Sequence, residues 1–237
     1  MKVRGRRILI IGDSLTHRGS REDPDQVDVT EGSARRSSSP GDLLASRLLE
    51  AGAGAVRIQA KVGRSIYTFF TKEPGAAILG SQRAWRPDVV LVMLGTNDTG
   101  YSVPVSERLF DELKGQLADL EVWGVGPPAF RDAELAGKGA GVAAAMKRVY
   151  GDRFVDFRPL TQDLTVRGRA GDGIHFTADG APIAAERLAK VLVAQGDDAD
   201  SRLWLGLGLA AIGVTVVVTG GLALFARGAT RSRRPRS

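Results

Sequence analysis

Cysteine is absent from this 237-residue sequence, and histidine occurs only twice, at His17 and His175. Without cysteine, disulfide bonds, thiolate catalysis and cysteine-ligated zinc are excluded. Two histidines leave too few ligands for a histidine-based metal site, so we expect neither a metal nor a cofactor. Hydrophobic residues make up 43% of the chain and charged residues 25%, which is typical of a folded protein with a sizeable core.

Acidic residues are missing from residues 201–237, which hold six arginines. This segment supplies the whole formal net charge of +6, because residues 1–200 balance 27 basic against 27 acidic side chains. A basic excess confined to a tail beside an apolar stretch favours a membrane over a nucleic acid. We therefore expect no nucleic-acid partner.

An uncharged stretch, LWLGLGLAAIGVTVVVTGGLALF, covers residues 203–225. Its 23 residues extend about 34 Å as a helix, which is enough to cross a bilayer. A buried core helix is the alternative, but such helices seldom run this long without a polar face. The sequence therefore predicts a single-pass transmembrane helix at 203–225, after an acidic linker at 196–202 and before a basic tail at 226–237.

The side of the membrane on which the rest of the chain lies stays open. The positive-inside rule keeps the arginine-rich tail in the cytoplasm and places residues 1–200 on the opposite side. The N-terminal stretch MKVRGRRILIIGDS, however, has only four consecutive apolar residues, whereas a secretory signal needs about 7–15. Both locations of the domain are kept as alternatives.

Short apolar strands alternate with helical patterns along residues 1–195, which we expect to form one domain. The predicted strands are 7–11, 56–60, 87–95, 121–128 and 153–157, and the predicted helices are 42–51, 106–120, 132–150 and 177–195. Residues 17–41 are polar and are predicted to form a long loop insertion. This alternation indicates an α/β fold, a three-layer α/β/α sandwich around a five-stranded, parallel, flavodoxin-like sheet.

Candidate functional residues follow three of the predicted strands. Ser14 comes after the first strand, Gly63 after the second and Asn97 after the third. Ligands of such sheets bind at the carboxyl ends of the strands, so we expect these residues to meet at one edge. Taken alone, Ser14 is more typical of a helix cap than of a nucleophile.

A serine nucleophile needs a base, a group that orients the base, and hydrogen-bond donors for the oxyanion. His175 is far from Ser14 in the sequence and is the natural base. Asp172 lies three residues before it and is placed to hold its second ring nitrogen. The amides of Ser14 and Gly63 and the side chain of Asn97 are candidate oxyanion donors.

Two rival interpretations are weaker. His17 lies close to Ser14 in the sequence, but no acid is placed to orient it, and a surface or loop role is favoured. The α/β-hydrolase signature G-x-S-x-G is absent, since Leu15 and Thr16 follow Ser14. The stretch ILIIGDS also has one glycine where a dinucleotide-binding fingerprint needs three.

In combination, these motifs resemble those of the GDSL/SGNH hydrolase family of serine esterases, lipases and acetylhydrolases. The shared residues are GDSLT at 12–16, a glycine at 63, GTND at 95–98 and DGIHFTADG at 172–180, in the order of the family. The resemblance implies Ser14 as the nucleophile, with Asp172 and His175 completing the triad. It implies Gly63 and Asn97 as oxyanion donors. Residues 17–41 and the apolar tail depart from the family pattern.

We therefore expect a serine esterase or deacylase, held at a membrane, that cleaves carboxylic esters through an acyl-enzyme. One alternative is an O-acyltransferase that passes the same acyl group to cell-surface glycans. The other is a non-catalytic carbohydrate-binding module on the same scaffold. The expected partners are a small-molecule, glycan or lipid ester and the membrane itself.

Overall fold

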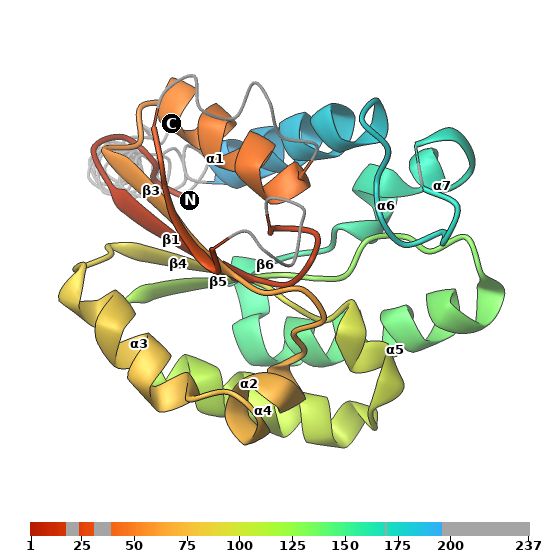
Figure 1. The fold of residues 1–237 in the computed structure, drawn as a ribbon, viewed down its shortest axis with the longest axis horizontal. Coiled ribbons are helices and arrows are strands. Elements are labelled where there is room, and N and C mark those ends of the chain that lie inside the picture. The colour runs from red at the N-terminus through yellow and green to blue at the C-terminus, as the bar shows by residue number, and fades with distance from the viewer. Residues whose placement is uncertain (18–23, 31–38, 169, 196–237) are drawn as a thin grey trace, which may run out of the picture. The chain divides into compact units, whose positions relative to one another are not determined.

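A six-stranded sheet forms the centre of the computed structural model, which describes residues 1–17, 24–30, 39–168 and 170–195 (Figure 1). The strands are β1 (Arg7–Gly12), β2 (Gln26–Val29), β3 (Ala55–Ala60), β4 (Val89–Met93), β5 (Glu121–Val125) and β6 (Phe154–Val155). Their order across the sheet is β2-β3-β1-β4-β5-β6, and every neighbouring pair is parallel except β2 with β3. The predicted α/β class is confirmed.

The edge strand β2 differs from the sequence-based prediction of a loop at 17–41 and of a purely parallel, five-stranded sheet. Residues Gln26–Val29 pair antiparallel with β3 inside that segment. Asp28 accepts two hydrogen bonds from Arg57 of β3, at 2.6 and 2.8 Å, and Val29 is buried. A short, charged strand of this kind suits a sheet edge, and its pairing depends on contacts that are distant in the sequence.

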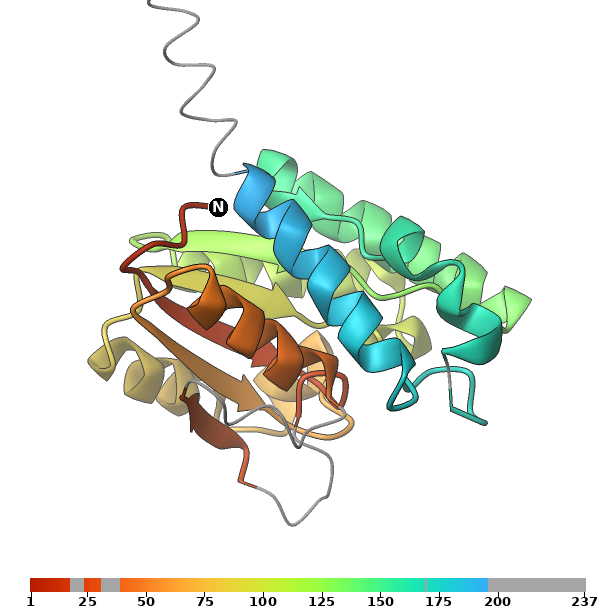
Figure 2. The ribbon, with the colours of Figure 1, turned by 90° about the horizontal axis from the view of Figure 1, so that it is seen from above.

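Helices cover both faces of the sheet, which gives the predicted three layers (Figures 1 and 2). The apolar side chains of β1 alternate: Ile8 and Ile10 belong to one core cluster, and Leu9 and Ile11 belong to the other. The first cluster includes α1 (Pro40–Glu50) and the final helix, 180–195. The second includes α2 (Ile66–Thr71), α3 (Gly75–Ala84), α4 (Val103–Gln116) and α5 (Ala133–Tyr150).

Two of the helices begin earlier than the sequence predicted. Helix α4 begins after Ser102, whereas the sequence suggested Ser106, which is buried inside the helix. Helix α1 begins after Ser39, whose side chain accepts the amide of Asp42. Short helical segments that the sequence did not predict are η2 (Asn97–Gly100), η3 (Gly151–Arg153), α6 (Arg158–Thr161) and α7 (Leu164–Arg167), together with α2 and α3.

The apolar C-terminal stretch lies outside the residues that the structure describes. Within the described ranges, no helix combines the length and apolar character that a bilayer crossing requires. The linker predicted at 196–202, the transmembrane helix at 203–225 and the tail at 226–237 therefore stay predictions from the sequence.

Candidate active site

Ser14 lies in a tight turn directly after β1, at the carboxyl edge of the sheet. Asp13 organises this turn, because its side chain accepts the amide of Leu15 at 2.9 Å and its carbonyl oxygen accepts the amide of Thr16 at 3.1 Å. Residues 14–16 form a turn rather than a helix, and the side chain that accepts an amide there is that of Asp13, not the hydroxyl of Ser14 that the sequence suggested as a helix cap. Gly12 permits the turn, since a Cβ at this position would lie 1.8 Å from Oγ1 of Thr16.

The hydroxyl of Ser14 contacts the imidazole ring of His175. Oγ of Ser14 and Nε2 of His175 are 2.9 Å apart, and Nδ1 of His175 is 2.6 Å from Oδ2 of Asp172. The second carboxylate oxygen of Asp172 accepts the amides of Ile174 and His175 at 2.8 and 3.0 Å. The fold therefore brings together the three residues that the sequence proposed for a triad.

The carboxylate of Asp172 fixes the proton arrangement of this chain of contacts. Burial alone would raise the pKa of Asp172, but hydrogen bonds from His175 and from the amide of Ile174 lower it to about 2. An ionised carboxylate only accepts hydrogen bonds, so Nδ1 of His175 carries a proton and donates it. In the neutral ring, Nε2 is then the acceptor for the hydroxyl of Ser14.

The sequence proposed three hydrogen-bond donors for an oxyanion, from Ser14, Gly63 and Asn97. These residues follow β1, β3 and β4, which are neighbours in the sheet. Gly63 follows β3 with φ +76°, a conformation that glycine adopts without strain. Within the described part of the chain, the amides of Ser14 and Gly63 have no hydrogen-bond acceptor. The side-chain amide of Asn97 donates to the carbonyl oxygen of Arg64 at 2.9 Å, and its second N–H is unused among the described residues. As far as the described residues extend, all three donors are open to a ligand.

Two buried carboxyl groups, Asp13 and Asp98, adjoin Ser14 and Asn97 in the sequence and were not predicted as site residues. Asp98 is fully buried and accepts the amide of Ile66 at 3.1 Å through both oxygens. Burial, together with repulsion from Asp13, raises the pKa of Asp98 to about 7. Burial also raises the pKa of Asp13 to about 6. The sequence contained a hint of their importance, since each acid directly adjoins a candidate site residue. Their burial, however, depends on the tertiary structure.

His17 lies in a bend, which agrees with the loop role that the sequence allowed, but it is not at the surface. Its side chain is buried, and Nε2 lies 3.9 Å from Oδ1 of Asp25. The prediction that no acid faces His17 was therefore wrong. The contact of Ser14 is nevertheless with His175, so the geometry favours His175 as the base.

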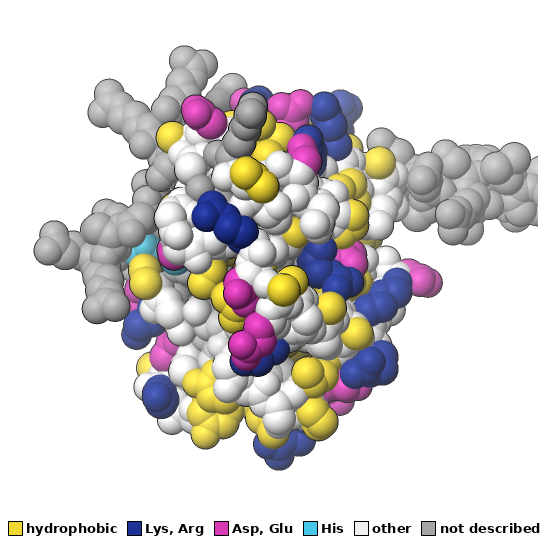
Figure 3. Space-filling view, turned by 90° about the vertical axis from the view of Figure 1, so that its right-hand side faces the viewer, with side chains coloured by type: hydrophobic (Ala, Val, Ile, Leu, Met, Phe, Trp, Pro, Cys, Tyr) yellow, Lys and Arg dark blue, Asp and Glu magenta, His cyan; other side chains and the backbone are white. Residues whose placement is uncertain are grey.

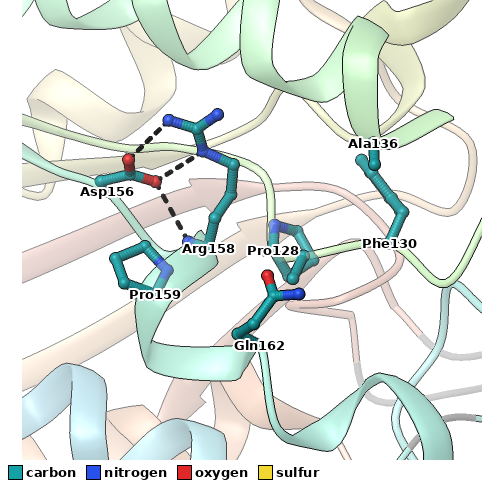
Figure 4. A pocket seen from close by; sticks show the side chains of 8 residues that line it. Pro128, Phe130, Ala136, Asp156, Arg158, Pro159 and Gln162 are labelled. Carbon is teal, nitrogen blue, oxygen red and sulfur yellow. Dashed lines mark hydrogen bonds and ion pairs between the residues drawn. The ribbon is translucent and has the colours of Figure 1, made fainter. Parts of the chain in front are cut away.

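A cavity of about 550 Å³ lies between the segments that follow β5 and β6, with Pro128, Phe130 and Gln162 in its lining (Figure 4). Asp156 and Arg158 also line it, but they hydrogen-bond to each other at 2.9 and 2.6 Å. On the face that forms the right-hand side of Figure 1, charged side chains of both signs are interspersed with apolar ones (Figure 3). None of the triad candidates lines the cavity, so it offers space without a reacting group.

The chain belongs to the GDSL-like lipase/acylhydrolase family, whose model matches residues 10–183. The match spans every candidate site residue from Ser14 to His175. The resemblance inferred from the four sequence motifs is confirmed, and the chain is an ester hydrolase of the SGNH type.

Solved structures support the fold at low sequence identity. Axe2, an acetylxylan esterase from Geobacillus stearothermophilus, matches with a TM-score of 0.59 and 18% identity, over 80% of this chain and 95% of that one. LAE5, an α/β hydrolase enzyme from the metagenome of Lake Arreo, matches with a TM-score of 0.64 and 21% identity, over 82% and 97%. A comparison with curated protein sequences gave no match.

Proposed function

We propose that the protein is a serine esterase in which Ser14, His175 and Asp172 form the catalytic triad. The observation that carries this proposal is the continuous contact from Oγ of Ser14 through the ring of His175 to Asp172, at 2.9 and 2.6 Å. The residues come from two segments 161 positions apart, and each makes the contact that its proposed role requires. A non-catalytic binding module would have no need of this arrangement.

The reaction proceeds through an acyl-enzyme. Oγ of Ser14 attacks the ester carbonyl carbon while Nε2 of His175 takes the hydroxyl proton, and the carbonyl oxygen becomes an oxyanion. The C–O bond to the alcohol then breaks, and the alcohol leaves with the proton from His175. A water molecule, deprotonated by the same nitrogen, attacks the acyl-enzyme. Collapse of this second intermediate releases the carboxylic acid and returns the proton to Ser14.

The amides of Ser14 and Gly63 and the side chain of Asn97 stabilise both oxyanions. Preorganised donors of this kind stabilise the charge that develops in the transition state without reorganising at the moment of reaction. These three residues follow adjacent strands and have N–H groups without an acceptor in the described part of the chain, which supports the assignment. Asp172 remains ionised while the ring of His175 gains and loses its proton, because the pKa of Asp172 is held at about 2.

Hydrolysis is favoured over acyl transfer by the exposure of the base. The side chains of His175 and Asp172 are 45% and 46% exposed, so water reaches the position from which the acyl-enzyme is attacked. For the substrate, we propose a short-chain ester such as an acetylated saccharide, because an acetylxylan esterase is among the similar folds. Release of free acetate from an acetylated oligosaccharide supports hydrolysis, whereas acetate transferred to an added saccharide supports the transferase.

A fluorophosphonate probe tests the nucleophile directly, because it reacts with activated serines only. We expect covalent labelling of the wild-type protein, with the adduct on the peptide that contains Ser14. Asp172→Asn disturbs the orientation of His175 and is expected to slow this labelling strongly. Labelling at another serine would contradict the proposed triad.

We also propose that the enzyme is attached to a membrane through residues 203–225. The proposal rests on the sequence alone: 23 residues without a charge, followed within two positions by the first of five arginines. A membrane location would place the esterase next to surface glycans or lipids, according to the side on which the domain lies.

A further inference from the structure

Arg64 is a buried cation next to the oxyanion candidate Gly63, and the proposed mechanism assigns it no role. Its side chain is 0% exposed, and it forms an ion pair with Glu73, with Nη2 2.7 Å from Oε2. Its guanidinium carbon also lies 5.5 Å from the ring centre of Phe69. A buried ion pair is weak evidence for stability, since desolvation offsets most of its attraction. The other hydrogen bonds of Arg64 are therefore more informative about its role.

The guanidinium group joins the ends of two strands. Nη1 donates to the carbonyl oxygen of Gly12, the last residue of β1, at 3.3 Å and to that of Gln59 in β3 at 3.0 Å. Gly12 stands two residues before Ser14. The side chain of Arg64 therefore connects the turn that holds the nucleophile to the strand that leads to Gly63.

The main chain of Arg64 extends the same connection to the third element of the site. Its amide donates to the carbonyl oxygen of Lys61 at 3.2 Å, which closes the turn around Gly63. Its carbonyl oxygen accepts the side-chain amide of Asn97 at 2.9 Å. One residue thus contacts the segments that carry Ser14, Gly63 and Asn97.

We propose that Arg64 is a positioning residue that sets the distance between the nucleophile and the oxyanion donors. It does not touch the substrate. Its planar set of donors binds the carbonyl oxygens of Gly12 and Gln59 and the carboxylate of Glu73 at once, which the point charge of a lysine does not reproduce. The contact with Asn97 is made by the main chain of Arg64. This inference rests on the proposed function, because it assumes that Ser14 is acylated and that Gly63 and Asn97 bind the oxyanion.

Steady-state hydrolysis of p-nitrophenyl acetate by the full chain tests the proposal in Arg64→Met and Arg64→Lys. We expect kcat to fall about 10- to 100-fold in both variants, because small displacements of reacting groups are costly, while KM changes less than about threefold. Arg57→Met is the matched control: it also removes an arginine–carboxylate pair, but one that lies within β3 and points toward Asp28 on the edge strand. Its kcat is expected to stay within about twofold of the wild type.

Inhibition by phenylboronic acid separates positioning from partial unfolding. A boronic acid forms a tetrahedral adduct with an active serine, so its affinity reports on the oxyanion donors. If Arg64 positions these donors, the inhibition constant rises in parallel with the loss of kcat. If Arg64 only stabilises the fold, fewer molecules are active but those that remain have the wild-type inhibition constant, and the proposal is overturned.

The outcomes also separate this proposal from the proposed function. Full activity of the Ser14→Ala variant would contradict the proposed triad, and with it the proposed function. Inactive Ser14→Ala together with wild-type kcat in folded Arg64→Met would overturn only the positioning role. If Arg64→Met does not fold, Arg64→Lys decides, because it keeps a cation opposite Glu73; a wild-type kcat in this variant overturns the proposal.

Discussion

The side-chain amide of Asn97 donates a 2.9 Å hydrogen bond to the carbonyl oxygen of Arg64, the residue that follows Gly63. This bond fixes the orientation of the Asn97 amide and leaves one N–H for a substrate oxyanion. It also links the strand end after β4 to the strand end after β3. The relationship explains why an asparagine is suited to this position, since its NH2 group serves both purposes.

Asn97→Ala removes the donor and its link to Arg64 together. Loss of one oxyanion donor typically lowers turnover about 100- to 1,000-fold, and we expect a fall in kcat within this range. KM is expected to change little, because the bond strengthens only as negative charge develops on the substrate oxygen. Steady-state kinetics with p-nitrophenyl acetate measure both. If the substitution changed KM but not kcat, Asn97 would not be an oxyanion donor.

Gly63→Ala tests whether the backbone conformation of this residue serves the reaction. A Cβ at Gly63 meets nothing within 4 Å, but φ is +76°, so alanine costs about 1–2 kcal/mol of backbone strain. Gly5→Ala is a matched control, with φ +72° and equal open space, before β1. We expect both variants to lose similar stability in denaturant unfolding, and only Gly63→Ala to lose kcat. Equal activity in the two would show that Gly63 does not contribute.

Asp98→Asn is expected to change how stability depends on pH. The folded-state pKa of Asp98 is raised from 3.8 to about 7, so between these values the native state binds more protons than the unfolded state. The wild type therefore loses stability as the pH rises through this window. Asparagine does not ionise. We therefore expect the free energy of unfolding of the Asp98→Asn variant to fall less than that of the wild type between about pH 5 and about pH 8, by about 2–4 kcal/mol.

Urea unfolding at the two pH values measures this difference. Asp28→Asn provides the comparison, because a hydrogen bond from Arg57 lowers the pKa of Asp28 and the residue stays ionised throughout the window. Its pH dependence is expected to match that of the wild type. If the free energy of unfolding of Asp98→Asn fell with pH as much as that of the wild type, Asp98 would be ionised at low cost in the folded protein.

The membrane prediction is tested by comparing the full chain with residues 1–195. We expect the full chain to sediment with membranes and to resist extraction by high salt, because the apolar stretch 203–225 is long enough to span a bilayer. The shortened chain is expected to remain in the supernatant with unchanged esterase activity. Full-length protein released by salt alone would point to surface attachment through the arginines instead.

The sequence was informative where chemistry and local pattern coincide. The alternation of strands and helices gave the α/β class, and the strand ends correctly grouped Ser14, Gly63 and Asn97 on adjacent strands. The contact between Ser14 and His175 followed from the chemical needs of a serine nucleophile. These inferences depend on residue type and order, which the sequence contains directly.

The missed features depend on burial and on pairing across the fold. Nothing in the sequence shows that Arg64 is fully buried, because its partner carbonyls belong to strands that only the fold brings together. Strand β2 is similar, since its four residues become a strand through β3. For α2 a local signal existed, because Ser65 and Thr68 form a capping box. The helix has only six residues, IYTFFT, and its β-branched and aromatic side chains are equally typical of a strand.

The measurement that most directly tests the proposed triad is ester hydrolysis by Ser14→Ala, compared with wild type and with Ser102→Ala. Ser102 precedes α4 and makes no capping hydrogen bond through its side chain, so its variant controls for the substitution itself. We expect kcat/KM for p-nitrophenyl acetate to fall by at least about 1,000-fold in Ser14→Ala, with an unchanged melting temperature. Activity within about tenfold of the wild type in a folded Ser14→Ala protein would contradict Ser14 as the nucleophile.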